Sequence, residues 1–541
     1  MEKISVKGST GRPFILSILS GLVIGIAWPP LPFAPIVLIG FVPLIIVLEK
    51  SQNVKSTFIY SFITFFIWWA ITMYWMGNVS AGSLDYLLIF VGFILAPLSM
   101  TIPVLVTFWL RRKTSNVYSW FSLCFFWTAY EYLLSNWDLA YNWTMLGLSF
   151  SLFPSLVQIY ELIGTIGGSF VIIGLNILVF ILIWKWQNKL TLKSTIISII
   201  GILTFIMVIN LLTINTSKKS KMKAKVAILQ PNYDSYKILT NSSLDEQLNI
   251  IEQMTTSLSD EDIDLVLIPE GYLNGIENKR IIINKLDSSY AVKRLKILSK
   301  KINAAILSGF IGYTVYPDKT RATESATPVG NELYADVYNA AMLVSPDNST
   351  QFYAKSKLVP FMERVPFLSS FRPIEELHFS LNQTNRSYGR IDNQRTLHYK
   401  DLNIIPVICL ETVFPNYVRQ YANKGGNIIA IISNESWAGN TSGYLQNAYY
   451  SSLLAIQLNK SVVRSANSGV SLITDNNGII SSSTKWNERD IIIKEVQLNS
   501  SKSFYSKNGD YFGKISVAVS SILLLLVGIK LVREKLYKVK K

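Results

Sequence analysis

The sequence predicts a membrane protein in two parts: an α-helical bundle of eight spans and, inserted before the last span, an α/β sandwich domain. Half of the 541 residues are apolar and only 16% are charged, whereas soluble chains carry about 25% charged residues. Residues 215–514 nevertheless hold 34 Lys and Arg and 28 Asp and Glu. Short apolar runs recur in this polar block, as they do where strands are buried.

The net charge of +16 does not indicate a nucleic-acid partner. The two ends outside the polar block hold 17 basic and 7 acidic residues, so ten of the sixteen excess charges (17 − 7) flank apolar segments. Basic residues collect there on the cytoplasmic side of membranes. The only cysteines are Cys124 and Cys409 and there are two histidines, which excludes a disulfide framework and a Cys- or His-based metal site.

Seven apolar segments precede the polar block and one follows it. A spanning helix needs about 20 apolar residues. We expect spans near residues 15–28, 36–48, 58–76, 87–110, 118–135, 159–184, 195–213 and 515–532. The first two are short and flank a proline-rich turn, which leaves a tilted or a re-entrant course open. The predicted domains are a seven-span bundle (1–214), a catalytic domain (222–500), the eighth helix (513–533) and a basic tail (534–541).

Every second loop between these spans is basic. Lys and Arg occur before residue 13, at 50–55, 111–113 and 185–193, and after 529, but not at 28–35, 77–83 or 136–155. The positive-inside rule therefore places both termini in the cytoplasm and the polar block outside it.

Three acidic residues, Glu131, Asp138 and Glu161, lie in or beside the spans. Ionisable groups inside a membrane are usually functional. Because each one falls near the outer interface, a solvated span end is the alternative.

The polar block alternates apolar runs with helical patterns. Strands are expected at 226–229, 265–268, 304–308, 340–344, 402–409, 428–432 and 461–464, helices at 244–258 and 291–302, and a hairpin turn at 475–478. Together they predict an α/β sandwich.

Three polar residues stand at or near ends of these runs: Glu270, Lys355 and Cys409. A cysteine nucleophile needs a base for its proton and a donor for the oxyanion that forms on attack. A carboxylate can be the base, and a lysine lowers the thiol pKa and donates to the oxyanion. Singly, each residue has a structural explanation: a core cysteine, a solvated lysine, a helix-start glutamate. Their combination favours a catalytic site.

The frames around these residues resemble the apolipoprotein N-acyltransferases, membrane-embedded members of the nitrilase superfamily. The string Tyr-Ala-Lys-Ser-Lys-Leu-Val-Pro-Phe-Met-Glu at 353–363 resembles the lysine motif of that family. Val-Ile-Cys-Leu-Glu at 407–411, Ser-Asn-Glu-Ser-Trp at 433–437 and Arg-Ser-Ala-Asn-Ser-Gly at 464–469 are similar to three further motifs. The resemblance covers the whole chain and implies a four-layer αββα nitrilase-like domain. Departures are Lys357, Met362, Leu410 and Glu435, where His, Gly, Tyr and Asp are usual.

The resemblance implies acyl transfer from a phospholipid, through a thioester on Cys409, to the α-amino group of a lipoprotein's diacylglyceryl-cysteine. It implies Glu270 as base and Lys355 as oxyanion donor, with no cofactor or metal. Glu363, Glu411, Asn434 and Trp437 match family positions beside the site; for Glu411 a buried structural role and for Trp437 packing are the alternatives. We expect a monomer in the bacterial inner membrane with its catalytic domain in the periplasm.

An apolar stretch follows the lysine motif and includes Phe361, Met362, Val365, Phe367, Leu368 and Phe371. We interpret Phe361, Phe367 and Leu368 as a lipid entrance, with an ordinary packed loop as the alternative. Two rival functions are a membrane-tethered amidase with the same triad and a non-enzymatic scaffold or transporter. A bundle of eight spans argues against the first, and the lack of paired charges in mid-membrane argues against the second.

Overall fold

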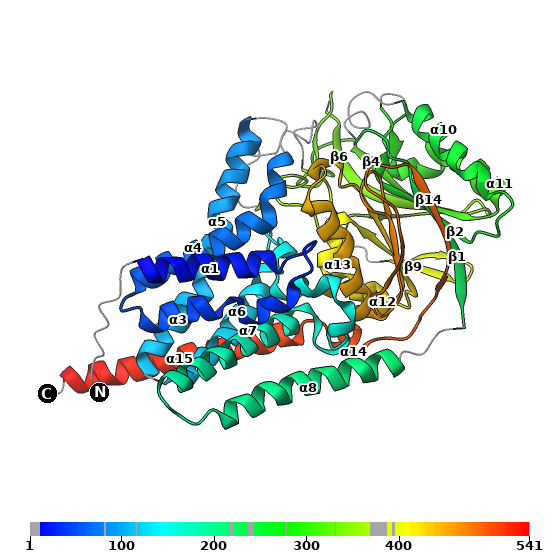
Figure 1. Ribbon diagram of the computed structural model, residues 1–541. Helices are drawn as coiled ribbons and strands as arrows, with labels where there is room; N and C mark the ends of the chain where they lie inside the picture. Colours follow the sequence, from blue (N-terminus) through cyan, green and yellow to red (C-terminus); the bar gives the residue numbers. More distant parts are fainter. Residues whose placement is uncertain are drawn as a thin grey trace.

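The computed structural model describes residues 11–79, 83–114, 116–216, 221–235, 243–276, 279–330, 332–367, 387–391 and 395–539. A helical bundle and a sandwich of two sheets lie next to each other (Figure 1). Helix α1 begins and helix α15 ends at the end of the bundle that is remote from the sandwich. The sandwich therefore sits at one end of the bundle, and the described chain starts and finishes at the other.

Nine helices make up the bundle as far as it is described. They are α1 (Gly11–Ile26), α2 (Val37–Gly40), α3 (Val42–Lys50), α4 (Val54–Met73), α5 (Ser83–Thr114), α6 (Ser122–Leu134), α7 (Tyr160–Gln187), α8 (Lys193–Thr216) and α15 (Tyr511–Val539). In the described part of the chain, five segments are helical, long and apolar enough to cross a membrane: Val54–Asn78, Tyr86–Thr114, Tyr160–Gln187, Lys193–Ile214 and Tyr511–Arg533. The segments expected at 15–28, 36–48 and 118–135 form shorter helices.

The segment expected at 36–48 is interrupted at Phe41, between α2 and α3. The side chain of Asn176 in α7 accepts a hydrogen bond from the Phe41 N–H at 2.8 Å and donates one to the Val37 carbonyl at 2.9 Å. Unpaired backbone groups are costly in an apolar surrounding. One buried amide therefore hydrogen-bonds to a backbone donor and a backbone acceptor at the break.

Close packing holds the remaining helices together. Gly21 and Gly25 of α1 face α4, where a Cβ atom would come within 2.5 and 2.8 Å of its atoms. Small residues of this kind let membrane helices approach each other. Behind them, Trp68 of α4 lies 5.4 Å from Trp28 and 6.2 Å from Trp127, measured between ring centroids.

The sandwich contains two sheets with parallel strands at their centres. The larger has the order β14-β1-β2-β4-β6-β5, with β3 paired to β4 and β7 paired to β6. Its strands are β1 (Lys223–Gln230), β2 (Leu265–Leu273), β3 (Ile281–Ile282), β4 (Ala305–Tyr316), β5 (Thr327–Pro328), β6 (Tyr334–Val344), β7 (Thr350–Ala354) and β14 (Asp490–Gln497). The smaller sheet has the order β13-β12-β11-β10-β9-β8. It consists of β8 (Leu397–Tyr399), β9 (Leu402–Ile408), β10 (Ile428–Ser433), β11 (Val462–Ala466), β12 (Leu472–Thr474) and β13 (Ile480–Ser483).

Alternation along the strands separates two apolar layers. Val226 and Ile228 of β1 face the second sheet, whereas Ala227 and Leu229 pack toward helices α10 (Leu244–Thr255) and α11 (Tyr290–Ile302). Helices α12 (Pro415–Asn423) and α13 (Ser442–Leu458) pack on the second sheet. The predicted αββα layering and the strands expected from the apolar runs are confirmed.

The bundle and the sandwich meet at a kink in α7. Gly164 has φ 66° and ψ −178°, and a Cβ atom there would lie 2.4 Å from the Tyr505 ring. The kink frees the N–H of Thr165, which donates to Oε1 of Gln457 in α13 at 3.1 Å. This backbone conformation is essentially restricted to glycine.

Replacing Gly164 by Ala should therefore destabilise the protein by about 1–3 kcal/mol, because the backbone is strained and the Tyr505 ring must move. Thermal unfolding in detergent micelles measures the effect. Gly174→Ala in the same helix is the control, since its Cβ would meet only Cys124 Sγ at 3.8 Å. Equal unfolding temperatures for the two variants would contradict the prediction.

Candidate active site

Three strands bring Glu270, Lys355 and Cys409 together. Glu270 lies in β2, Lys355 directly follows β7, and Cys409 directly follows β9. All three line one cavity of about 130 Å³. The predicted triad, which spans 140 residues of sequence, is thus gathered at one place.

Glu270 reaches the cavity because β2 is irregular. Its pairing with β4 is regular from Leu265 to Ile268 and shifts before Leu273, and Gly271 has φ 58°. Such bulges redirect a side chain. Gly309 of β4 makes room for the bulge, since a Cβ atom there would lie 2.2 Å from the Pro269 carbonyl oxygen.

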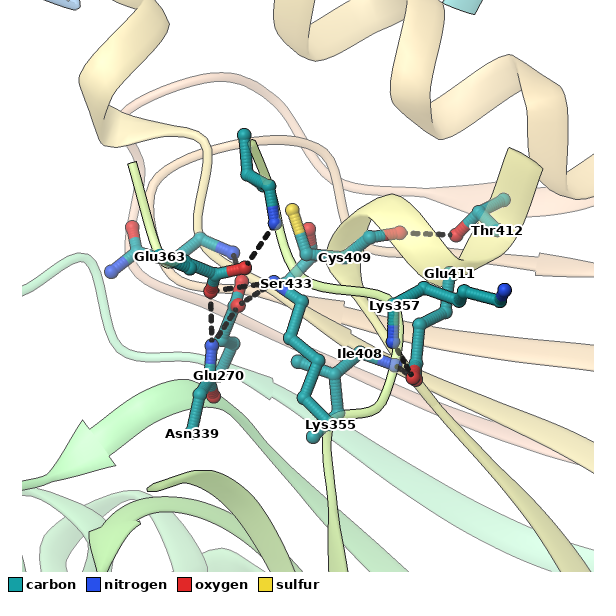
Figure 2. A network of polar contacts seen from close by, with 12 residues as sticks. Glu270, Asn339, Lys355, Lys357, Glu363, Ile408, Cys409, Glu411, Thr412 and Ser433 are labelled. Carbon is teal, nitrogen blue, oxygen red and sulfur yellow. Dashed lines mark hydrogen bonds and ion pairs between the residues drawn. The ribbon is translucent and has the colours of Figure 1, made fainter. Parts of the chain in front are cut away.

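Lys355 is a buried cation shared by two carboxylates. Its Nζ donates to Glu270 Oε1 at 3.1 Å and to Glu363 Oε1 at 2.8 Å, and its side chain is 1% exposed. Figure 2 shows these groups converging beside Cys409. Burial opposes the charge of Lys355, but Glu270 and Glu363 outweigh it and raise the lysine pKa. The amine therefore stays protonated.

Asn339 of β6 connects the two carboxylates and was not expected from the sequence. Its Nδ2 donates to Glu270 Oε1 at 2.7 Å and to Glu363 Oε1 at 2.9 Å (Figure 2). The backbone carbonyl of Asn339 also accepts a hydrogen bond from the backbone N–H of Lys355 at 2.9 Å. A single Asn inside an apolar run gives no pattern that sequence analysis can detect. Its role becomes visible only because β6 pairs with β7, which brings Asn339 next to Lys355.

Cys409 occupies a strained turn at the end of β9. Its φ of 49° lies in the left-handed region, which residues other than glycine adopt at a cost. Burial, and then the nearby Glu270 carboxylate, raise the thiol pKa, while Lys355 opposes them. Burial also raises the pKa of Glu270. The resting thiol is therefore protonated and faces a carboxylate that binds protons more readily than an exposed one.

Glu411 joins the turn of Cys409 to the lysine motif. Its Oε1 accepts from Tyr353 Oη at 2.6 Å and from the N–H of Ser356 at 2.9 Å. Its Oε2 accepts from the Ile408 N–H at 2.9 Å. The side chain is fully buried, and burial raises its pKa. These contacts support the structural alternative for Glu411.

Asn434 and Trp437 also line the cavity. The Asn434 N–H donates to Glu270 Oε2 at 2.9 Å, and its Oδ1 accepts from Ser235 Oγ at the same distance. Asn434 therefore fixes the second carboxylate oxygen of Glu270 through its backbone N–H. Tyr388 is a further cavity residue that the motifs did not indicate.

The expected lipid entrance lies partly within the described residues. Met362 lines the cavity, whereas Phe361 and Phe367 do not. The Phe367 ring lies 6.1 Å from Trp137 of the bundle, and its N–H donates to Asp138 Oδ2 at 3.0 Å. Leu368 and Phe371 lie outside the described residues.

The other two acidic residues near the spans are not at the cavity. Glu131 Oε1 accepts from Trp127 Nε1 and from the Leu146 N–H, both at 2.9 Å. Glu161 Oε1 is 3.5 Å from Asn459 Nδ2. Glu131 thus ties α6 to the segment that follows it.

Two family profiles match the chain. Residues 20–178 match the apolipoprotein N-acyltransferase N-terminal domain, and residues 225–505, more than half of the chain, match carbon-nitrogen hydrolase. The chain belongs to the apolipoprotein N-acyltransferases of the carbon-nitrogen hydrolase family. The two matched regions of this chain coincide with the bundle and the sandwich.

Several apolipoprotein N-acyltransferases are similar over almost the whole chain. That of Chlorobaculum tepidum is 27% identical, covering 96% of this chain and 97% of the relative. That of Rickettsia typhi is 26% identical, covering 95% and 96%. Among solved structures, Saccharomyces cerevisiae Nit3, a member of branch 10 of the nitrilase superfamily, covers 52% of this chain and 92% of its own, with 18% identity and a TM-score of 0.37.

The Asn339 amide, which two carboxylates share, is expected to contribute to the stability of the fold. Asn339→Leu keeps the volume but removes a donor to two carboxylates. We expect a loss of about 1.5–3 kcal/mol in stability, the usual range for hydrogen bonds to charged groups. Thermal unfolding in detergent measures it, with Ser345→Ala as the control because the buried Ser345 Oγ has no partner among the described residues. No difference between the two would show that the carboxylates do not need the amide.

Proposed function

We propose that this protein transfers an acyl chain from a phospholipid, through a thioester on Cys409, to the α-amino group of the N-terminal diacylglyceryl-cysteine of lipoproteins. The observation that carries the proposal is the cavity that Glu270, Lys355 and Cys409 share beside a bundle of apolar helices. The names of the relatives support an N-acyltransferase of lipoproteins.

The first half-reaction begins when a Glu270 oxygen takes the proton of Cys409. The sulfur attacks the ester carbonyl carbon, and the negative charge that moves to the carbonyl oxygen is stabilised by the ammonium of Lys355. The tetrahedral intermediate then loses the lysophospholipid alkoxide, which receives the proton from Glu270. The acyl chain remains on sulfur as a thioester.

In the second half-reaction the lipoprotein amine attacks the thioester carbonyl. Glu270 accepts the proton that the amine loses, and Lys355 again stabilises the oxyanion. The carbon–sulfur bond breaks, the amide is released, and the sulfur leaves as a thiolate that recovers the proton from Glu270. Because the ester already carries an activated acyl group, the reaction needs no cofactor or metal.

The surrounding residues support these steps without taking part in the bond changes. Glu363 holds the Lys355 ammonium and accepts the Val359 N–H at 2.8 Å. Glu411 fixes the turn of Cys409 relative to the lysine motif. Asn434 orients the Glu270 carboxylate, and Trp437 shapes the cavity wall.

We further propose that all eight predicted segments cross the bacterial inner membrane, with residues 1–214 as a seven-span unit and 513–533 as the eighth. Both termini are then cytoplasmic and the domain at 222–500 is periplasmic. Both substrates have chains that gain about 0.8 kcal/mol per buried methylene in a bilayer. A site held at the membrane surface avoids lifting these chains into water. We expect the protein to act as a monomer.

Incubation with phospholipid alone should add one acyl mass to Cys409. Intact-protein and peptide mass spectrometry measure it. Glu270→Gln should lower the rate of adduct formation by about a hundredfold or more, the contribution usual for a general base. Cys124→Ala is the control, because Cys124 lies in α6 away from the cavity and should leave the adduct unchanged.

A Cys409→Ser protein that still acylates a lipoprotein peptide would refute the thioester. A wild-type adduct that is released only by water, and never by the lipoprotein amine, would favour the amidase alternative. Absence of any adduct and of any acyl transfer would favour the non-enzymatic alternative.

The entrance interpretation is tested at Phe367, which is 37% exposed beside Trp137. Phe367→Ser should lower the rate of adduct formation with a long-chain phospholipid about tenfold and that with a short soluble ester much less, because only the long chain needs the apolar surface. Because both rates are measured on the same variant, the short soluble ester serves as the control. Equal losses on both substrates would argue for an ordinary packed loop.

A further inference from the structure

Helix α13 lies between the bundle and the sandwich. All of its residues except Leu445 and Tyr449 are buried. A helix buried on every side is part of a core rather than a surface. It contacts α7 and the segment 146–152 of the bundle on one side and the turn of Cys409 on the other.

One face of α13 is fixed to tryptophans at the ends of the bundle helices. Gln446 Oε1 accepts from Trp75 Nε1 at 3.2 Å and from Trp143 Nε1 at 2.6 Å. One turn later, Tyr450 Oη accepts from Trp28 Nε1 at 2.9 Å. These buried hydrogen bonds hold the helix in a single register against the bundle.

Asn447, which follows Gln446 in α13, lies beside Cys409. Its Nδ2 lies 3.9 Å from Cys409 Sγ and donates to Glu435 Oε1 at 2.7 Å and to Ser433 Oγ at 3.2 Å. The residue is fully buried. A buried amide in mid-helix is costly unless its donors are used, and here the amide nitrogen donates to the Glu435 carboxylate and to Ser433 while lying beside the thiol.

The direction of this amide is set by a buried ion pair. Glu435 contacts Arg464 of β11, whose side chain has no exposure and whose Nη1 donates to the Val470 carbonyl at 2.5 Å. Gly469 leaves room for the carboxylate, since a Cβ atom there would lie 2.5 Å from Glu435 Oε2. The ion pair therefore anchors Glu435, and Glu435 anchors Asn447.

We propose that Asn447 is a positioning residue for Cys409: its side-chain amide directs the sulfur into the cavity and stabilises the thiolate that the reaction forms. This inference rests on the proposed function only in naming Cys409 as the nucleophile. An N–H donor favours the charged form of the group it faces. Asn447 thus supplements the effect of Lys355 on the sulfur without adding a second positive charge.

The charged and titratable groups around the sulfur come from several elements. Glu270 of β2 and Glu435 after β10 disfavour the thiolate, and Lys355 after β7 favours it. Tyr141 also interacts electrostatically with the thiol, and the Ser433 hydroxyl, which donates to Glu435, lowers the thiol pKa. Two carboxylates thus oppose one cation, and a neutral donor between the sulfur and Glu435 reduces the repulsion from that side.

The test is the pH dependence of Cys409 alkylation by iodoacetamide in the full-length protein in detergent, followed by peptide mass. Asn447→Leu keeps the volume and removes the donor. We expect its half-maximal rate to move about one pH unit upward, which is a tenfold lower rate at a fixed pH below the midpoint. The pH profile separates this role from a purely structural one, which would lower stability without moving the midpoint.

Ser451→Ala is the matched control, because Ser451 is buried one turn along α13 and its hydroxyl has no partner among the described residues. It should keep the wild-type midpoint. Asn447→Asp, which has the same shape, replaces the donor by a carboxylate and should move the midpoint further upward. If Asn447→Leu does not fold, the alkylation midpoint of Asn447→Asp tests the proposal.

A wild-type midpoint in either folded Asn447 variant would overturn the proposal. Alkylation needs no lipid, so the two hypotheses fail separately. A shifted midpoint in a protein that forms no acyl adduct would sink the proposed function alone, whereas an acyl adduct with an unshifted midpoint would sink only the role of Asn447.

Discussion

The site depends on one buried ammonium held between two carboxylates. Burying the Lys355 charge is costly, and it is tolerated because Glu270 and Glu363 both accept from it. The same cation keeps two carboxylates close together that would otherwise repel each other. Asn339 adds a donor to each of them without adding charge. Any rearrangement of one member leaves a charge buried without its partner, so the cluster is rigid before a substrate arrives.

That rigidity extends to the sulfur through backbone contacts. Glu411 accepts N–H groups from both the lysine motif and the end of β9, so the two sheets cannot slide relative to each other at the site. The left-handed backbone of Cys409 is strained, and strain of this kind persists only where the surroundings fix the conformation. The Cys409 turn is therefore placed by backbone N–H groups that donate to Glu411, whereas Glu270 and Lys355 are held by side-chain contacts with Glu363 and Asn339.

The strands and the triad could be predicted because their signals are local. Apolar runs that end in a polar residue mark buried strands, and Glu270, Lys355 and Cys409 each close or follow such a run. Asn339 and Asn447 could not be predicted, since an amide inside a strand or a helix gives no spacing signal and the partners of each lie on other parts of the fold. The break at Phe41 escaped for the same reason: the amide that satisfies it is Asn176, 135 residues later. The spacing of apolar residues reveals helices and strands. Contacts between residues that are far apart in the sequence produce no pattern in that spacing.

Under the proposed function, the lining of the cavity bears on why acyl transfer would prevail over hydrolysis. Glu270, Lys355 and Cys409 alone would serve water as well as an amine, because both attack a thioester through the same oxyanion. Water and the amine differ in how readily they enter the cavity. Val359, Met362 and Trp437 form an apolar part of the cavity wall beside the polar groups of Glu270, Lys355 and Asn434. An acceptor that carries acyl chains gains free energy from contact with this apolar wall, whereas water gains none from it.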